Sequence, residues 1–226
     1  MNQELATIIK KYSTESHEDL NRYLLEKSKD NLIASLVDLI TMYINDKNSS
    51  TLREFLTVTL AGYTHLGEKI GYNGFKQETS LKGTRENLEI KCEAKPKNIL
   101  TSSGKNKKLN GYGNFSDYTF ARLEKDSKEK NLKILVSGFI DGKIIYLLEF
   151  PFNYKNFVLN LRKQLLKRFP GGKDIPTEYL RSANFSYKDF SNCKELKIVY
   201  LIKPQELERY RKYFIKDFYD FLIKLK

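Results

Sequence analysis

The sequence predicts a mixed α/β or α+β fold, in which a helical N-terminal region precedes a central mixed sheet flanked by helices. Three observations support this fold class. Residues 1–70 contain no proline and place apolar side chains at helical intervals. Residues 87–95 alternate apolar and charged side chains with the period of a β-strand. Helical spacing returns after residue 150, where Phe157, Leu161 and Leu165 share one side.

Three or four helices are expected in residues 1–70. The last of them should begin after segment 48–50, whose asparagine and serines are good N-cap residues. It should end between Gly67 and Gly71, because glycine terminates a helix at low cost. This end would place Glu68 in the final turn.

A strand is expected over residues 87–95, and Pro96 should end it. Segment 75–81 and the turn-prone residues 82–85 come before it, so a hairpin is predicted. The strand has an apolar face and a charged face. The apolar face holds Leu88, Ile90, Cys92 and Ala94, and the charged face holds Glu89, Lys91, Glu93 and Lys95.

The elements expected after residue 95 alternate between helices and strands, separated by proline, glycine or polar residues. In order, they are a basic mobile loop (96–114), a short helix (118–124), a strand pair (132–150) turning at Asp141-Gly142, a helix (154–169), a segment of weak periodicity (174–194), a buried strand (196–202) and a terminal amphipathic helix that begins at Pro204.

The composition indicates a single soluble domain of 226 residues with a polyanionic partner. Forty Lys and Arg against 28 Asp and Glu give a net charge of +12, which favours nucleic acid or an anionic membrane surface. No segment suggests a membrane span or a secretory signal, so a cytoplasmic location is expected. Two cysteines and two histidines form no zinc or disulfide pattern, which leaves carboxylates and lysines to carry any chemistry.

The charged face of strand 87–95 is the candidate for that chemistry. Phosphodiester hydrolysis needs a metal held by carboxylates and a cation near the attacking water. Glu89 with Lys91 supplies this combination on one strand face, and Glu93 with Lys95 supplies it again one period further on. Glu78 is the expected second carboxylate, and Glu68 is a third candidate. The alternative is a solvated strand surface, since alternating Glu and Lys is common there.

The order of these parts favours the catalytic interpretation. An acid-ended helix, an acid on a hairpin strand, an ExK strand, a basic loop, a helix and a strand pair follow one another. Over residues 66–150 this order resembles the PD-(D/E)xK nuclease superfamily, and within it the type II restriction endonucleases of the PvuII- and EcoRV-like branch. The segment Asn87-Leu-Glu-Ile-Lys-Cys92 is similar to the ExK strand of the family. The resemblance implies a restriction-endonuclease-like core.

The resemblance also implies residue roles. Glu89 would be a metal ligand, and Lys91 would orient or polarise the attacking water. Glu78 would be the first acid and a metal ligand, although the family usually has Asp after Pro there and this chain has Gln77 before Glu78. The spacing from the first acid to the ExK unit in the family favours Glu89 and Lys91. Glu93 and Lys95 are reserves, or contacts to a second metal or to the DNA backbone.

The function implied by the resemblance is Mg²⁺-dependent cleavage of double-stranded DNA at a palindromic, A·T-rich site, with Mn²⁺ as a substitute ion. A palindromic site calls for a homodimer, and residues 1–70 are the candidate interface. Residues 71–170 would form the catalytic core, and residues 171–226 a DNA-reading and capping part. A cognate DNA methyltransferase is expected in the same cell, but not bound. The alternatives are a resolvase or repair nuclease with the same core, and a non-catalytic DNA- or RNA-binding protein.

DNA contacts are predicted in two segments. The loop after the strand offers lysines for phosphate groups and asparagines for adenine, and segment 181–188 offers a second set. The alternative for each of these residues is an ordinary polar surface. The predicted contacts are Lys105, Asn106, Lys107, Lys108, Asn110, Tyr112, Asn114, Arg181 and Asn184.

Overall fold

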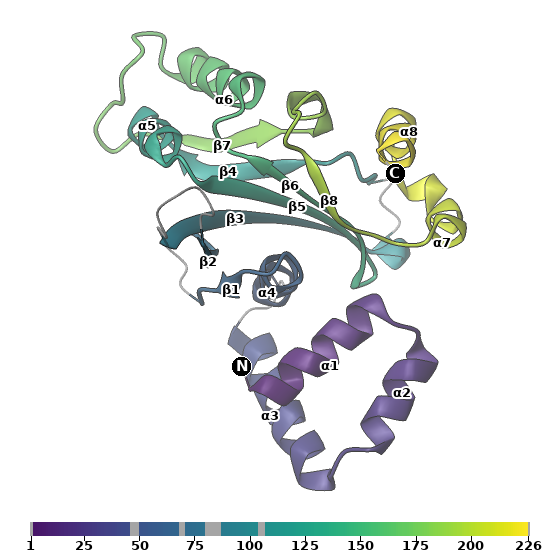
Figure 1. Ribbon diagram of the computed structural model, residues 1–226. Helices are drawn as coiled ribbons and strands as arrows, with labels where there is room; N and C mark the ends of the chain where they lie inside the picture. The colour runs from purple at the N-terminus through teal and green to yellow at the C-terminus, as the bar shows by residue number, and fades with distance from the viewer. Residues whose placement is uncertain (1, 46–49, 68–70, 80–86, 104–106, 226) are drawn as a thin grey trace.

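The computed structural model describes residues 2–45, 50–67, 71–79, 87–103 and 107–225, which form a mixed α/β fold (Figure 1). A six-stranded mixed sheet has the order β1-β2-β3-β5-β6-β8, and β4 pairs with β7 in a separate two-stranded ribbon. Within the described residues, no helix is long and apolar enough to cross a membrane. The strands are β1 (Thr64–His65), β2 (Gly74–Thr79), β3 (Asn87–Ile99), β4 (Gly113–Tyr118), β5 (Leu132–Ile140), β6 (Lys143–Pro151), β7 (Leu180–Phe185) and β8 (Lys197–Leu201).

The helical N-terminal region is confirmed. Its helices are α1 (Gln3–Thr14), α2 (His17–Leu25), α3 (Lys29–Asn45) and α4 (Ser50–Leu60). The prediction that the last helix ends near residues 67–71 is wrong. Gly62 follows the helix with a φ of +80°, a backbone conformation that glycine adopts without steric cost and that ends helices. The helix therefore ends before Glu68, which lies outside the described residues.

The hairpin at Asp141-Gly142 is confirmed, since β5 and β6 pair antiparallel on either side of it. The prediction that Pro96 ends the preceding strand is wrong, because β3 continues to Ile99 in parallel pairing with β5. Ala94 directs its N–H away from β5, toward the Asn73 side chain. Pro96, two residues later, points the same way, where β2 no longer pairs. A missing N–H costs no ladder hydrogen bond at that edge.

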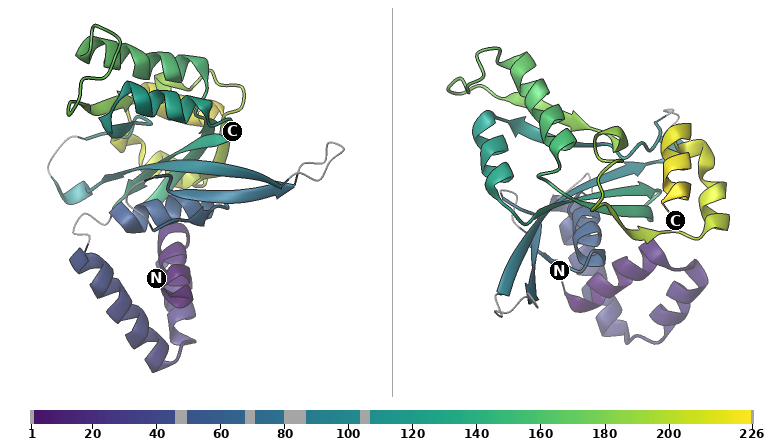
Figure 2. Two further views of the ribbon diagram at one scale, coloured as in Figure 1. Left: turned by 90° about the vertical axis from the view of Figure 1, so that its left-hand side faces the viewer. Right: turned by 45° about the horizontal axis from the view of Figure 1, so that its top comes forward.

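The two faces of the sheet have separate hydrophobic cores. Helices α1 and α4 cover one face, where they pack on Ile90, Cys92 and Leu147. The ribbon covers the other face with α5 (Phe120–Lys128), α6 (Lys155–Arg168) and α8 (Lys216–Lys224) (Figures 1 and 2). This second core is rich in phenylalanine. The ribbon, α5 and the open edge of β3 together form the setting of the candidate site.

The C-terminal third differs from the prediction in three respects. Segment 180–185 forms β7, although its periodicity is weak, because backbone pairing with β4 stabilises the strand. Strand β8 is partly exposed instead of buried, because it pairs only with β6 at the sheet edge. The terminal helix is interrupted between α7 (Pro204–Arg209) and α8, where Leu109 exchanges backbone hydrogen bonds with Tyr213 and Ile215.

Candidate functional site

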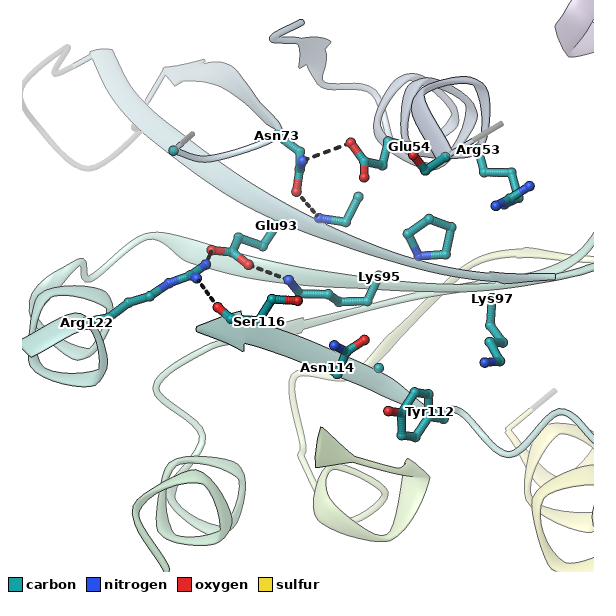
Figure 3. Close-up of a pocket in the computed structure, with 15 residues that line it drawn as sticks. Arg53, Glu54, Asn73, Glu93, Lys95, Lys97, Tyr112, Asn114, Ser116 and Arg122 are labelled. Carbon is teal, nitrogen blue, oxygen red and sulfur yellow. Dashed lines mark hydrogen bonds and ion pairs between the residues drawn. The ribbon is translucent and has the colours of Figure 1, made fainter. Parts of the chain in front are cut away.

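A cavity of about 400 Å³ lies over the second half of β3, and we call it the Glu93 cavity (Figure 3). Helix α4 forms one wall, and β4 with α5 forms the other. Polar and charged side chains dominate its lining. They are Ser50, Arg53, Glu54, Asn73, Glu93, Lys95, Lys97, Tyr112, Asn114, Ser116 and Arg122.

Glu93 is the central acid of the cavity and is only 3% exposed. One carboxylate oxygen lies 2.7 Å from Lys95 Nζ, and the other lies 2.9 Å from an Arg122 nitrogen. Burial alone would raise the pKa of Glu93, but the two cations outweigh it and hold that pKa below its ordinary value. Glu93 is thus an ionised carboxylate at neutral pH, kept away from bulk water.

The backbone explains why Glu93 and Lys95 meet at this point. They share one face of β3 because side chains repeat every second residue. Gly113 lets β4 pass close beside them, since a Cβ built there would lie 2.9 Å from Lys95 Cβ. Lys95 Nζ lies 4.1 Å from the centre of the buried Phe115 ring of β4. The close approach of β4 therefore fixes Lys95 between the carboxylate and an aromatic ring.

Asn73, just before β2, connects the α4 wall of the cavity to β3. Its carbonyl oxygen accepts a hydrogen bond from Ala94 N (2.8 Å), and its amide nitrogen donates to Glu54 Oε2 (3.3 Å). The acid of α4 is thereby held beside the strand that carries Glu93 (Figure 3). The carboxylates of Glu54 and Glu93 and the amide oxygen of Asn73 therefore all border the Glu93 cavity.

Arg122 of α5 bridges Glu93 to a second buried acid, Asp126, whose Oδ2 lies 3.7 Å from Arg122 Nε. Arg122 also donates to the Ser116 carbonyl at 3.2 Å. Burial, reinforced by the nearby Glu93, raises the pKa of Asp126 to about 6, although Arg122 opposes the shift. One arginine thus faces two enclosed carboxylates, of which Asp126 is the weaker acid.

The raised pKa of Asp126 predicts a pH-dependent stability. The folded protein binds this proton more tightly than the unfolded chain, whose Asp has a pKa near 3.8. The stabilisation is therefore present below pH 4 and is lost as pH rises from about 4 to 6. Relative to Asp126→Asn, the wild type should lose on the order of 2–3 kcal/mol of unfolding free energy across this range. Urea denaturation at several pH values measures it.

The control for this experiment is Asp117→Asn, because Asp117 is exposed on the same side of the cavity and an asparagine tolerates its positive φ. Its unfolding free energy should follow the wild type at each pH. Parallel curves for Asp126→Asn and the wild type would contradict the assigned pKa.

The expected pairing of Glu78 with Glu89 is not found. In the β2–β3 register Glu78 lies opposite Leu88 and Gln77 lies opposite Glu89, so the two acids project from opposite faces of the sheet. Glu78 is exposed and forms an ion pair with Lys76 at 2.9 Å. These two carboxylates therefore cannot bind the same ion.

Glu89 and Lys91 lie outside the cavity. Glu89 belongs to the part of β3 that pairs with β2 alone, on the arm that extends past the rest of the sheet (Figure 2). Lys91 forms its shorter ion pair with Glu129, at 2.8 Å, and lies 3.8 Å from Glu89. Of the two ExK units, the structure encloses Glu93 and Lys95.

The predicted DNA-contact residues fall into three groups. Tyr112 and Asn114 line the Glu93 cavity, and Asn114 is the cross-strand partner of Asn184 in the β4–β7 ribbon. Arg181 is exposed on β7. The remaining residues belong to the segment before β4. Lys107 and Lys108 are exposed, and Asn110 is half-buried, where its backbone carbonyl accepts a hydrogen bond from Tyr187 N. Lys105 and Asn106 lie outside the described residues.

Several residues of the cavity were not predicted from sequence, and Glu54, Asn73 and Arg122 are the ones that contact Glu93 or its strand. Glu54 and Arg122 lie on helices whose charged positions resemble any solvated helix face. Asn73 precedes a strand, where a polar residue is unremarkable. The dipeptide Asn73-Gly74 is a turn signal, and such a signal indicates a chain reversal more than a site.

Within the described part of the chain, no group of three or more His, Cys, Asp or Glu side chains is arranged to hold a metal ion. No protein-family model, curated protein or solved structure matches this chain.

Proposed function

We propose that this chain is a metal-dependent endonuclease of the PD-(D/E)xK kind that acts on double-stranded DNA as a type II restriction enzyme. The observation that carries the proposal is the enclosed pair Glu93 and Lys95, two residues apart on one strand face, with Glu54 across the cavity. The proposed ExK unit is therefore Glu93-Ala94-Lys95 instead of Glu89-Ile90-Lys91. The mixed sheet is compatible with a restriction-endonuclease-like core.

The residues present fit Mg²⁺, with Mn²⁺ as a substitute. Glu54 and Glu93 offer carboxylate oxygens, and Mg²⁺ is commonly held by one or two carboxylates together with water and substrate phosphate. The third polar side chain beside these two carboxylates is the amide of Asn73, which carries no charge. When bound, the ion would stabilise the negative charge that develops on the phosphate.

The side chains of the chain itself have distinct proposed roles. Glu93 stays ionised and provides the negative charge of the site. Lys95, beside it, orients the attacking water and stabilises the charge that develops there. Arg122 holds Glu93 in place when DNA is absent and neutralises part of its charge. Arg53 and Lys97, on the cavity wall, attract the phosphate backbone.

A non-catalytic DNA-binding protein is the second candidate. It is favoured by one observation, that both oxygens of Glu93 are already in ion pairs and an amide stands at Asn73. A metal ion would have to compete with Arg122 for the carboxylate. In this alternative, the cavity binds phosphate without cleaving it.

Incubation of the purified full chain with genomic DNA tests the proposal. With Mg²⁺ we expect a set of discrete fragments, and with EDTA we expect intact DNA. A smear in place of bands would indicate a nuclease that does not follow sequence. DNA that stays intact in Mg²⁺ and in Mn²⁺ but is shifted in a gel would favour the binding protein.

A further inference from the structure

The β4–β7 ribbon has one apolar face and one polar face. Phe115, Ala183 and Phe185 are buried against the sheet core. The residues between them alternate to the other side, as strand geometry requires. These are Asn114 opposite Asn184 and Ser116 opposite Ser182. Two amides and two hydroxyls thus form a polar face whose inner edge borders the Glu93 cavity.

Asn114 is the member of this face nearest to the proposed chemistry. Figure 3 shows its side chain directed from β4 into the cavity that also holds Lys95 and Lys97. Among the described residues, no hydrogen bond is made by its amide group, which is half-buried. An amide with its donor and acceptor both unpaired is suited to an external partner that presents an acceptor beside a donor.

Asn184, in contrast, is held firmly. Gln164 of α6 donates to its carbonyl at 2.7 Å and accepts from its backbone N–H at 2.8 Å. The hydroxyl groups of Tyr112 and Ser182 both donate to its side-chain oxygen. The ribbon is therefore tied to α6 at the position opposite Asn114, so the Asn114 amide is presented from a rigid support.

Cations surround this polar face. Lys97 Nζ lies 5.2 Å from the centre of the Tyr112 ring. Burial, and after it the positive charge of Lys107, lowers the pKa of Lys97. Lys107 and Lys108 are exposed at the approach to β4. A polyanion is the partner that such a surface favours.

We infer that the polar face of the β4–β7 ribbon enters the major groove of B-form DNA and that Asn114 recognises an adenine there. The inference rests on the proposed action on DNA. A two-stranded ribbon fits the major groove of B-DNA, and asparagine pairs with the N6 donor and N7 acceptor of adenine. The deep, narrow major groove of A-form RNA would not admit the ribbon. The contacted base pair would lie next to the phosphate that faces Lys95.

Binding selection tests this inference without requiring cleavage. The full chain is incubated, in Ca²⁺ without Mg²⁺, with duplex oligonucleotides that carry a randomised central segment, and the bound pool is sequenced. The wild type should enrich an A·T pair at a defined position. Asn114→Ala should reduce the preference for that pair roughly 10- to 100-fold. Affinity for unrelated duplex DNA should stay the same, since phosphate contacts supply it.

Asn153→Ala is the matched control, because Asn153 is exposed between β6 and α6, outside the Glu93 cavity, the ribbon and residues 1–70. It should enrich the wild-type motif. The inference is overturned if Asn114→Ala enriches an unchanged motif, if the wild type enriches none, or if duplex RNA binds equally well. If binding is selective and depends on Asn114 but no cleavage occurs in Mg²⁺, the proposed nuclease activity is rejected and the base contact by the ribbon is retained. Cleavage without base preference would reject the ribbon contact alone.

Discussion

Replacement of Glu93 by glutamine should abolish DNA cleavage while DNA binding persists. Glutamine keeps the size of the side chain and an acceptor oxygen, but removes the charge that would hold a metal ion beside Lys95. Metal-based charge stabilisation contributes several kcal/mol to such a reaction, so the cleavage rate should fall by about 100- to 1000-fold or more. Single-turnover cleavage of a plasmid substrate in Mg²⁺ measures the rate.

The matched control is Glu89→Gln, on the same face of the same strand but outside the cavity. It should cut at the wild-type rate. The reverse outcome, in which Glu89→Gln loses cleavage and Glu93→Gln retains it, would return the site to the first half of β3 and contradict the proposal.

Folding must be monitored in this experiment. Removing one member of a buried ion pair leaves the remaining charges without compensation, which can cost about 3–5 kcal/mol. Lys95→Met is a second variant, because Glu93 keeps its ion pair with Arg122 in it. It should unfold close to the wild-type urea concentration and still lose cleavage. A folded Lys95→Met that cuts normally would exclude the proposed role of the lysine.

Replacement of Phe157 by alanine should lower the stability of the fold strongly. Phe157 of α6 is fully buried, and its ring lies 5.0 Å from the rings of Phe150 and Phe185, centre to centre. It therefore joins α6, the sheet and the ribbon. Removing a buried phenylalanine leaves a cavity and costs about 3–5 kcal/mol of unfolding free energy. Equilibrium denaturation in urea measures the loss.

Leu159→Ala is the control for Phe157→Ala, since Leu159 is on the same helix and 51% exposed. The unfolding free energy of this variant should stay within about 0.5 kcal/mol of the wild type. Equal losses in the two variants would show that α6 contributes through its own helical stability instead of through the aromatic contacts. The ribbon would then need another source of rigidity.

The sequence by itself determined the elements whose signals are local. Alternation along residues 87–95 predicts β3, because neighbouring side chains of any strand face opposite ways. Asp141-Gly142 predicts the β5–β6 hairpin because few residues adopt the backbone angles of its turn. Helical spacing and Pro170 predict α6. The charge balance indicates an anionic partner, and the chemistry of Glu and Lys singles out the strand whose second half borders the Glu93 cavity.

Only the tertiary structure decided which half of that strand is enclosed. Glu89-Ile90-Lys91 and Glu93-Ala94-Lys95 have the same local pattern, so alternation cannot separate them. The difference comes from residues that are distant in the chain: Arg122 and Asn73 are brought to Glu93 and Ala94 by α5 and by the start of β2. Burial and ion pairing depend on such neighbours, whereas the period of a strand depends only on its own backbone.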